Sequence, residues 1–291
     1  MTNDSRVCVL GLGAMGSRMA ERLRAAGRSV TVWNRGPGPR EAMAAAGFEV
    51  ADTPRAAAEG AGVVVAMVRD DEASRATWGG ADGALAGLAP DAVAVEASTL
   101  TPGRVRELAE EVAARGGAFV EAPVVGSRPQ AEAGQLVTLA AGEASALERA
   151  RPVLEAWSGR VVPLGEPGRA AVAKLAVNAF FATQVAAAAE AADLLRRAGV
   201  ADEAWLELLG GLPVTSAPVA AALQGIAAAR WSPAFPVELV EKDLGYALAT
   251  AEELGATRPV TAAVHGLYNA AREAGHGDLN LHAVARVLGT G

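Results

Sequence analysis

Lys174 and Lys242 are the only lysines of this chain, and every other one of its 26 basic residues is an arginine. An alanine- and arginine-rich composition favours arginine wherever a solvated charge is sufficient. A retained lysine therefore marks a position where a guanidinium cannot replace an ammonium group. Lysine can give up a proton, whereas arginine stays charged. The two lysines are candidates for proton transfer or ligand binding.

Asn178 follows Lys174 by four residues in a segment rich in Ala, Leu and Val. This segment, residues 167–198, lacks proline after its first turn, which predicts one helix of about thirty residues. Apolar residues lie nearly all round it, so we expect burial on more than one side. Residues four apart share a helix face, and Lys174 and Asn178 should project together.

A glycine motif follows the first apolar run of the chain. It reads G-L-G-A-M-G and consists of Gly11, Leu12, Gly13, Ala14, Met15 and Gly16. Between a strand and a helix, the first glycine allows a tight turn, the second lets the backbone approach a pyrophosphate, and the third permits close packing. The helix N-terminus favours negative charge. The motif predicts dinucleotide binding, and the helical periodicity of residues 14–26 predicts a helix that begins near Ala14.

The second predicted strand ends in Asn34 and Arg35, and Arg40 follows five residues later. An NAD site usually has Asp or Glu here, to accept from the ribose 2′-hydroxyl. A carboxylate would repel a 2′-phosphate, whereas an amide beside a guanidinium attracts it. We therefore expect NADP in preference to NAD.

The composition is that of a globular protein without a nucleic-acid surface. The chain has 291 residues, 51% of them hydrophobic, and a formal net charge of −7. Nucleic-acid binding normally requires a basic face. The single cysteine, Cys8, supports no disulfide or zinc site, and we expect it to be buried. His265, His276 and His282 lack metal-like spacing and should have surface or packing roles.

The N-terminus is polar and its apolar run is too short for a signal peptide. No uninterrupted apolar stretch reaches the ~18 residues of a membrane span. We expect a cytoplasmic protein that binds neither membranes nor nucleic acid. We also expect it to bind no metal ion.

Short, β-branched apolar runs alternate with amphipathic segments up to about residue 163. Such alternation predicts an α/β domain with a mainly parallel, doubly wound sheet. Only helical patterns follow, including a segment that begins near Pro236 and ends before Gly255. The prediction is two domains, 1–163 and 164–291, with an all-α C-terminal domain joined by the long helix.

With these motifs the chain resembles the β-hydroxyacid dehydrogenase family, which includes 3-hydroxyisobutyrate dehydrogenases and glyoxylate/succinic semialdehyde reductases. Five segments match in order: 11–16, Ser98-Thr99 with Pro102, 121–136, 168–178 and 235–243. The resemblance implies a Rossmann-like domain, a helical domain, and homodimers whose helical domains pack together and help to complete the active site. It also implies that Thr99 lies near the nicotinamide, with Met67 and Val68 flanking the cofactor.

The segment from Glu121 to Ser127 resembles the substrate-binding segment of the family, D-A-P-V-S-G-G or E-A-P-V-S-G-S. The resemblance implies that Val124, Val125, Gly126 and Ser127 contact substrate. Where the family has a serine that holds the substrate carboxylate, this chain has Val125, which makes the pocket more apolar. Ser127 or Arg128 is a candidate to compensate.

The resemblance further implies that Lys174 is the general acid and that Asn178 orients it or binds substrate oxygen. Lys242 would face the cofactor or substrate, and Asp243 would pair with Lys242 or support packing. Trp231 and Phe235 would line the substrate pocket or belong to the core.

We therefore expect an NADPH-dependent reductase of a small aldehyde or keto acid, or, in reverse, a 3-hydroxyacid dehydrogenase. An imine reductase or a reductase of uncharged carbonyls is the alternative, which Val125 leaves open. Imine reductases generally have another residue at the lysine position, often Asp or Tyr. A non-catalytic NADP-binding module is disfavoured by Lys174, Asn178 and Lys242.

Overall fold

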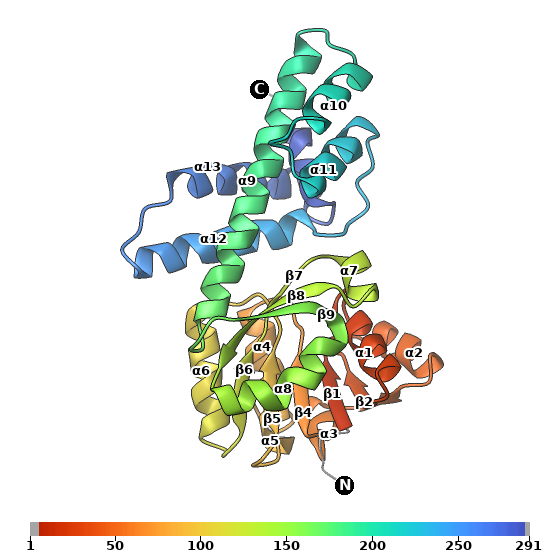
Figure 1. Ribbon diagram of the computed structural model, residues 1–291, viewed down its shortest axis with the longest axis vertical. Coiled ribbons are helices and arrows are strands. Elements are labelled where there is room, and N and C mark those ends of the chain that lie inside the picture. Colours follow the sequence, from red (N-terminus) through yellow and green to blue (C-terminus); the bar gives the residue numbers. More distant parts are fainter. Residues whose placement is uncertain (1–5, 289–291) are drawn as a thin grey trace. The chain divides into compact units, whose positions relative to one another are not determined.

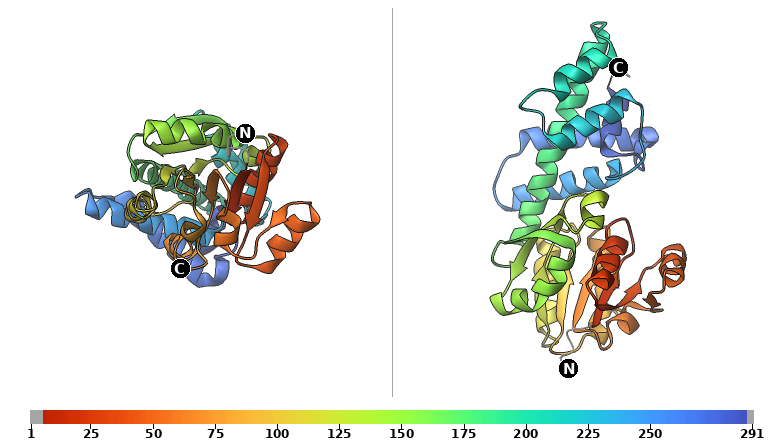
Figure 2. Two further views of the ribbon diagram at one scale, coloured as in Figure 1. Left: turned by 90° about the horizontal axis from the view of Figure 1, so that it is seen from below. Right: turned by 45° about the vertical axis from the view of Figure 1, so that its right-hand side comes forward.

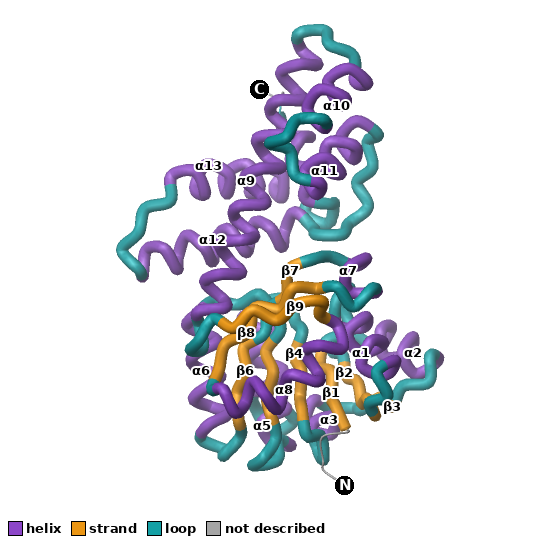
Figure 3. Tube along the Cα trace, in the orientation of Figure 1, coloured by secondary structure: helices purple, strands orange, loops and turns teal. Residues whose placement is uncertain are grey.

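The computed structural model describes residues 6–288 and divides into two compact units, 1–174 and 175–291. The polar residues 1–5, on which the absence of a signal peptide was predicted, lie outside the described residues. Among the described residues, every strand lies in the first unit, and the second unit consists of helices and loops (Figure 3).

The first unit is built on a sheet whose first six strands are parallel and run in the order β3-β2-β1-β4-β5-β6 (Figure 1). These strands are β1 (Arg6–Leu10), β2 (Ser29–Trp33), β3 (Glu49–Val50), β4 (Val63–Ala66), β5 (Val93–Glu96) and β6 (Ala118–Glu121). Beyond β6 the sheet continues with β8 (Leu136–Gly142), which is antiparallel to β6 and to β7 (Val124–Val125) and parallel to β9 (Ser158–Pro163).

Alternation along β1 shows why helices cover both faces of the sheet (Figure 2). Successive side chains of a strand point to opposite faces. Val7 and Val9 belong to one buried cluster, and Cys8 and Leu10 belong to the other. The first cluster includes residues of α1 (Gly16–Ala25), α2 (Pro37–Ala45) and α8 (Ala144–Trp157). The second includes residues of α3 (Pro54–Ala58), α4 (Asp71–Trp78), α5 (Ala84–Gly87) and α6 (Pro102–Ala113).

This arrangement confirms the doubly wound, mainly parallel sheet and the burial of Cys8, whose pKa is raised because the thiol is buried. The two-residue strands β3 and β7 were not predicted, since so short a run has no detectable period. The first helix was expected to begin near Ala14, but it begins at Gly16 because the preceding residues form the glycine turn.

The second unit begins within α9 (Arg169–Arg197), which was expected over residues 167–198. The other helices of this unit are α10 (Asp202–Gly210), α11 (Ala217–Ala227), α12 (Val237–Glu253), α13 (Pro259–Ala271), a π-helical turn (Arg272–His276) and a 3-10 helix (Leu281–Val287). Their core is built around Trp205, Leu223 and Tyr268. Pro236 precedes α12 as its cap rather than lying inside its first turn, and Gly255 follows the helix with a positive φ.

By length and composition alone, α9 could cross a membrane, unlike any other described helix. The core helix of a globular domain meets the same criterion, and Ala182, Val185 and Ala189 of α9 are buried in the core of the second unit. We therefore interpret its apolar character as packing.

A buried arginine joins two helices of the first unit. The Arg104 side chain, on α6, has no exposed surface. It donates to the Ser74 hydroxyl of α4 at 3.2 Å and pairs with Glu111 and Glu107, each at 3.2 Å. Ser74 in turn donates to the buried Glu96 at the end of β5. A cation without exposed surface is tolerated only where such partners surround it.

Replacing Arg104 should destabilise this unit far more than replacing its exposed neighbour. Arg75, which is half-exposed, also pairs with Glu107, at 3.0 Å. We expect Arg104→Met to lower the free energy of unfolding by about 3 kcal/mol, since it breaks a network of hydrogen bonds and ion pairs and leaves the buried Ser74 hydroxyl without its donor. The matched Arg75→Met should cost less than about 1 kcal/mol. Urea unfolding of both variants measures the difference, and equal losses would contradict the assigned role of Arg104.

Candidate active site

The glycine turn between β1 and α1 has a steric reason at two of its three glycines. Gly11 has a φ of +95°, and a Cβ there would lie 2.2 Å from the Met67 carbonyl oxygen. A Cβ on Gly16 would lie 1.9 Å from the carbonyl oxygen of Gly11. A Cβ on Gly13, by contrast, would meet no protein atom within 4 Å. Open space over this backbone and the adjacent helix N-terminus fits the expected approach of a pyrophosphate.

Asn34 connects the end of β2 to the glycine turn. Its side-chain oxygen accepts from the Leu12 amide at 3.0 Å, and its Nδ2 donates to the Gly36 carbonyl at 3.1 Å. The Asn34 amide thus holds two loops together, a role that the sequence did not reveal. Arg35 beside it is exposed, and this guanidinium is the group at the end of β2 that could meet a phosphate.

The loops that follow β4 and β5 are joined by Ser98. The Val68 amide donates to the Ser98 hydroxyl at 2.7 Å, and Met67 packs beside Gly16. Thr99 follows, partly buried. Met67, Val68 and Thr99 therefore gather at the carboxyl edge of the parallel strands, where ligands bind in such sheets.

Glu96 organises these loops and was not predicted from the sequence. It is fully buried and accepts from Trp78 Nε1 at 2.9 Å, from the Ser74 hydroxyl at 3.1 Å and from the Ser98 amide at 3.1 Å. Burial raises the pKa of Glu96, while its hydrogen bonds act in the opposite direction. A carboxylate at the end of an apolar strand was the signal that could have identified it.

The residues expected to contact substrate begin in β7. Val124 is buried, and Val125 is partly buried against a cluster that includes Leu139 and, on α9, Ala170 and Ala173. Lys174 follows directly, so Val125 makes the surroundings of the first turn of α9 apolar.

The turn after β7 leads into α7 (Arg128–Glu132). Gly126 has a φ of +127°, and a Cβ there would lie 2.7 Å from Leu136. The Ser127 amide donates to the Gln130 side chain at 3.0 Å in a capping box. Because Ser127 is engaged in this cap, Arg128 is the stronger candidate to compensate for the missing serine.

Lys174 and Asn178 are both buried, with exposed fractions of 9% and 7%, and lie one turn apart on α9. In the second unit, Asn178 Nδ2 donates to Asp243 Oδ2 at 2.6 Å. The other Asp243 oxygen pairs with Lys242 Nζ at 3.0 Å, and Lys242 also lies over the Tyr246 ring at 4.8 Å. Asp243 thus holds Asn178 and the partly buried Lys242 in one polar group in the second turn of α12.

Trp231 lies in a different environment from this polar group. Its ring centroid is 5.3 Å from that of His282, which is buried and binds the Arg230 carbonyl oxygen. Trp231 and Phe235 pack against the core of the second unit. These contacts favour packing, one of the two roles considered for both aromatic residues.

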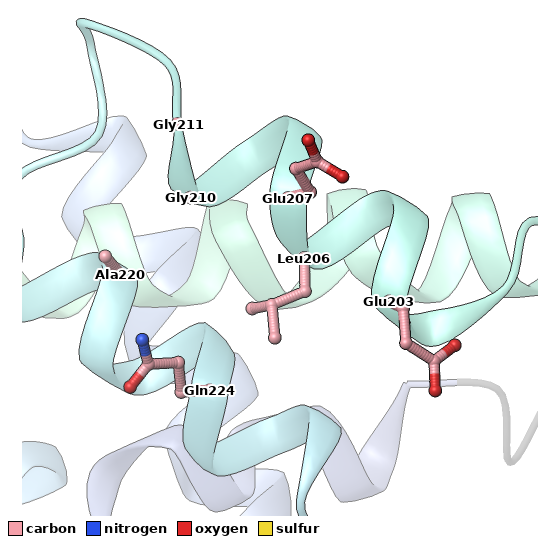
Figure 4. A pocket seen from close by; sticks show the side chains of 7 residues that line it. All are labelled: Glu203, Leu206, Glu207, Gly210, Gly211, Ala220 and Gln224. Carbon is pink, nitrogen blue, oxygen red and sulfur yellow. The ribbon is translucent and has the colours of Figure 1, made fainter.

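A pocket of about 470 Å³ lies between α10 and α11, with Leu206 extending into it and Glu203 and Glu207 along α10 (Figure 4). None of the predicted site residues lines it. Among the described residues, no group of His, Cys, Asp and Glu is arranged to hold a metal ion.

The glycine turn separates a ligand-binding role from a folding role, and two matched substitutions test this. Gly13→Ala should weaken NADPH binding at least tenfold, about 1.4 kcal/mol, and change the free energy of unfolding by less than about 0.5 kcal/mol. Gly16→Ala should destabilise the fold itself by about 1–3 kcal/mol, because its Cβ overlaps backbone. Fluorescence titration and urea unfolding measure these effects, and a destabilised Gly13→Ala would refute the assignment.

Comparison with known proteins identifies the family of the chain. Residues 6–165 match the model of the NAD binding domain of 6-phosphogluconate dehydrogenase. Residues 168–288 match the model described as NAD-binding of NADP-dependent 3-hydroxyisobutyrate dehydrogenase. Glyoxylate/succinic semialdehyde reductase 1 of Arabidopsis thaliana is 31% identical over 279 residues, which cover 96% of each chain.

Two solved structures share the fold over nearly their full length. A 3-hydroxyisobutyrate dehydrogenase from Mycobacterium tuberculosis, solved with L-serine, has a TM-score of 0.87 at 30% identity and covers 98% of this chain and 99% of its own. One from Salmonella typhimurium has a TM-score of 0.90 at 26% identity, with coverage of 97% and 99%. The chain therefore belongs to the β-hydroxyacid dehydrogenase family and is an NAD(P)-dependent oxidoreductase acting on CH–OH groups.

Proposed function

We propose that this protein is an NADPH-dependent reductase of a small aldehyde or keto acid, with Lys174 as the general acid. One observation carries the proposal: Lys174 is buried and lies one turn before Asn178, whose amide is itself fixed by Asp243 at 2.6 Å. A buried ammonium group without a functional role would be a costly feature of a helix.

In this reaction the bound nicotinamide supplies the hydride. Lys174 gives a proton to the carbonyl oxygen as negative charge develops there, which is general acid catalysis. Asn178 offers an oriented amide on the same helix face, because Asp243 occupies one of its donors. In the reverse direction Lys174 accepts the proton of the hydroxyl group.

A preference for NADPH is supported by the residues at the end of β2. The Asn34 amide is engaged by Leu12 and Gly36, and no carboxylate occupies the position that accepts from a ribose 2′-hydroxyl in NAD sites. Arg35 is exposed, and its guanidinium would attract a 2′-phosphate instead.

A second substrate class is supported by Val125. Its side chain packs with Leu139, Ala170 and Ala173 and offers no hydroxyl to a carboxylate. An uncharged carbonyl compound, or an imine, is the alternative substrate that this apolar surface favours, whereas Lys174 favours the carbonyl.

We also propose a cytoplasmic homodimer. Phe180 and Leu194 of α9 are each 69% exposed, and Val260 of α13 is 60% exposed. Large apolar side chains exposed on the helices of the second unit would be buried by association with a second copy of the chain.

Removing the lysine tests the reaction. Lys174→Ala should lower kcat for NADPH oxidation by about 10³-fold, with a small effect on the KM for NADPH, because proton transfer typically contributes 10²- to 10⁴-fold. Lys174→Arg should not restore activity, since arginine holds its proton. Arg197→Ala, which removes an exposed cation of the same helix, is the control.

The substrate panel for this test contains glyoxylate, succinic semialdehyde, methylglyoxal and a cyclic imine. Turnover of an acid that depends on Lys174 supports the leading proposal. Turnover confined to methylglyoxal or the imine supports the alternative, and an active Lys174→Ala enzyme would refute the role of the lysine.

The cofactor preference is tested at Arg35. Arg35→Ala should raise the Kd for NADPH about tenfold, the scale of one charge-assisted contact, and leave the Kd for NADH unchanged. Arg160→Ala, which removes another exposed charge of the same unit, should affect neither. Equal weakening of both cofactors in Arg35→Ala would argue against recognition of the 2′-phosphate.

A further inference from the structure

Glu121 is a buried carboxylate that the proposed reaction does not use. It is the last residue of β6 and is 1% exposed. Its Oε2 accepts from the Gly168 amide at 2.7 Å, and its Oε1 accepts from the Ala171 amide. Both amides lie at the start of α9, so one side chain from the sheet holds the beginning of the helix that carries Lys174.

The first amides of a helix have no partner within the helix, and a cap residue usually supplies one. Gly168 directly precedes α9 and has no side chain with which to do so. Glu121 satisfies two of these amides from a distant strand, and its negative charge lies at the positive end of the helix dipole. With one oxygen on each amide, it restrains both the position and the rotation of the first turn.

Lys174 follows Ala171 by three residues, which places the two on neighbouring parts of the same helix face. The turn leading into the helix has little room to adjust. Gly168 has a φ of +95°, and a Cβ there would lie 3.0 Å from the guanidinium of Arg106. Because Lys174 lies on the same rigid helix as Ala171, a shift of the first turn of α9 would move Lys174 as well.

We propose that Glu121 is a positioning residue that holds Lys174 in its working place through the first turn of α9. The inference rests on the proposed role of Lys174. It identifies Glu121 as the group that fixes the position of that lysine. It assigns to Glu121 no contact with substrate or cofactor.

The charge of Glu121 responds to pH near neutrality. Burial raises the pKa of Glu121 to about 7, and the neighbouring carboxylate of Glu96 acts in the same direction, while the backbone amides lower it. Glu96 is its register partner on β5. Arg106 of α6 lies against Gly168, and Arg169, Lys174 and Glu166 are the charged groups nearest in the chain to the start of α9. The remaining charges of α6 are Arg104, Glu107, Glu110 and Glu111, those of α8 are Glu148, Arg149, Arg151 and Glu155, and β8 contributes none.

The carboxylate accepts from both amides, whereas the protonated acid has one oxygen that carries a proton and accepts poorly. The start of α9 is therefore held more firmly as pH rises through about 7. Because the folded-state pKa lies above the ordinary value of 4.5, the folded chain binds the extra proton between these values. Complete unfolding exposes Glu121 and restores its ordinary pKa, so the free energy of global unfolding falls as pH rises across this window. Opening of the first turn alone leaves Glu121 buried without the amides that lower its pKa, so this local opening becomes less favourable as pH rises.

The test compares two acid-to-amide substitutions that act on the two ends of α9. Glu121→Gln changes the carboxylate at the first turn. The control, Asp202→Asn, changes the carboxylate that pairs with Arg196 in the last turn at 2.7 Å. Both are measured beside wild type and Lys174→Ala, as kcat and KM from about pH 5.5 to about pH 9.

We expect Glu121→Gln to lower kcat at about pH 8 by roughly tenfold or more, as small misplacements of catalytic groups do, with little change in the KM for NADPH. The kcat of the wild-type enzyme should rise as pH increases through about 7. This rise should be absent in Glu121→Gln and present again in Glu121→Asp. Asp202→Asn should retain the wild-type profile. An unchanged profile in Glu121→Gln, or an equal loss in Asp202→Asn, overturns the inference.

Amide exchange in the unmodified protein provides a measurement that needs neither a variant nor a substrate. After correction for intrinsic exchange, Gly168 and Ala171 should be protected about tenfold more at about pH 8 than at about pH 6. Equal protection overturns the inference. Increased protection beside a fully active Lys174→Ala enzyme overturns instead the role of the lysine, and with it the link from Glu121 to catalysis.

Discussion

The candidate site depends on how the loops at the carboxyl edge of the sheet are held. Two neighbouring parallel strands, β5 and β6, each end in a buried glutamate, Glu96 and Glu121. Their oxygens accept hydrogen bonds from the amides of Ser98, Gly168 and Ala171 and from the side chain of Trp78, in the loops and helices next to this edge. Buried polar groups must be paired, so these carboxylates make close-packed irregular backbone possible at that edge.

Most of the fold could be predicted from the sequence because it follows from periodicity. Runs such as 6–10 and 29–33 are buried on both faces and contain no competing pattern, and the long helix was expected within two residues of its observed ends. The failures were local. β3 and β7 are too short to show a period, and Gly16 rather than Ala14 begins α1 because the turn, not helix propensity, sets that start.

The candidate site was predictable where a residue type is unusual and not where its role depends on a partner distant in sequence. Lys174 and the glycines were recognisable from rarity and spacing. The link from Asn178 to Asp243 spans 65 residues, and that from Glu121 to Gly168 spans 47. No local pattern encodes such pairs. The contact of the Asn34 side chain with the Leu12 amide spans 22 residues, and this structural role was likewise not visible in the sequence.

The three glycines of the turn between β1 and α1 differ in what requires a glycine at each position. Gly11 and Gly16 are required by the chain itself, because any side chain would overlap backbone. At Gly13 nothing in the protein excludes a methyl group, and glycine there increases the entropy of the unfolded chain. Folding alone would therefore favour a residue with a side chain at this position. Glycine here leaves the backbone open to a pyrophosphate, so this one small residue marks where the cofactor is expected to lie.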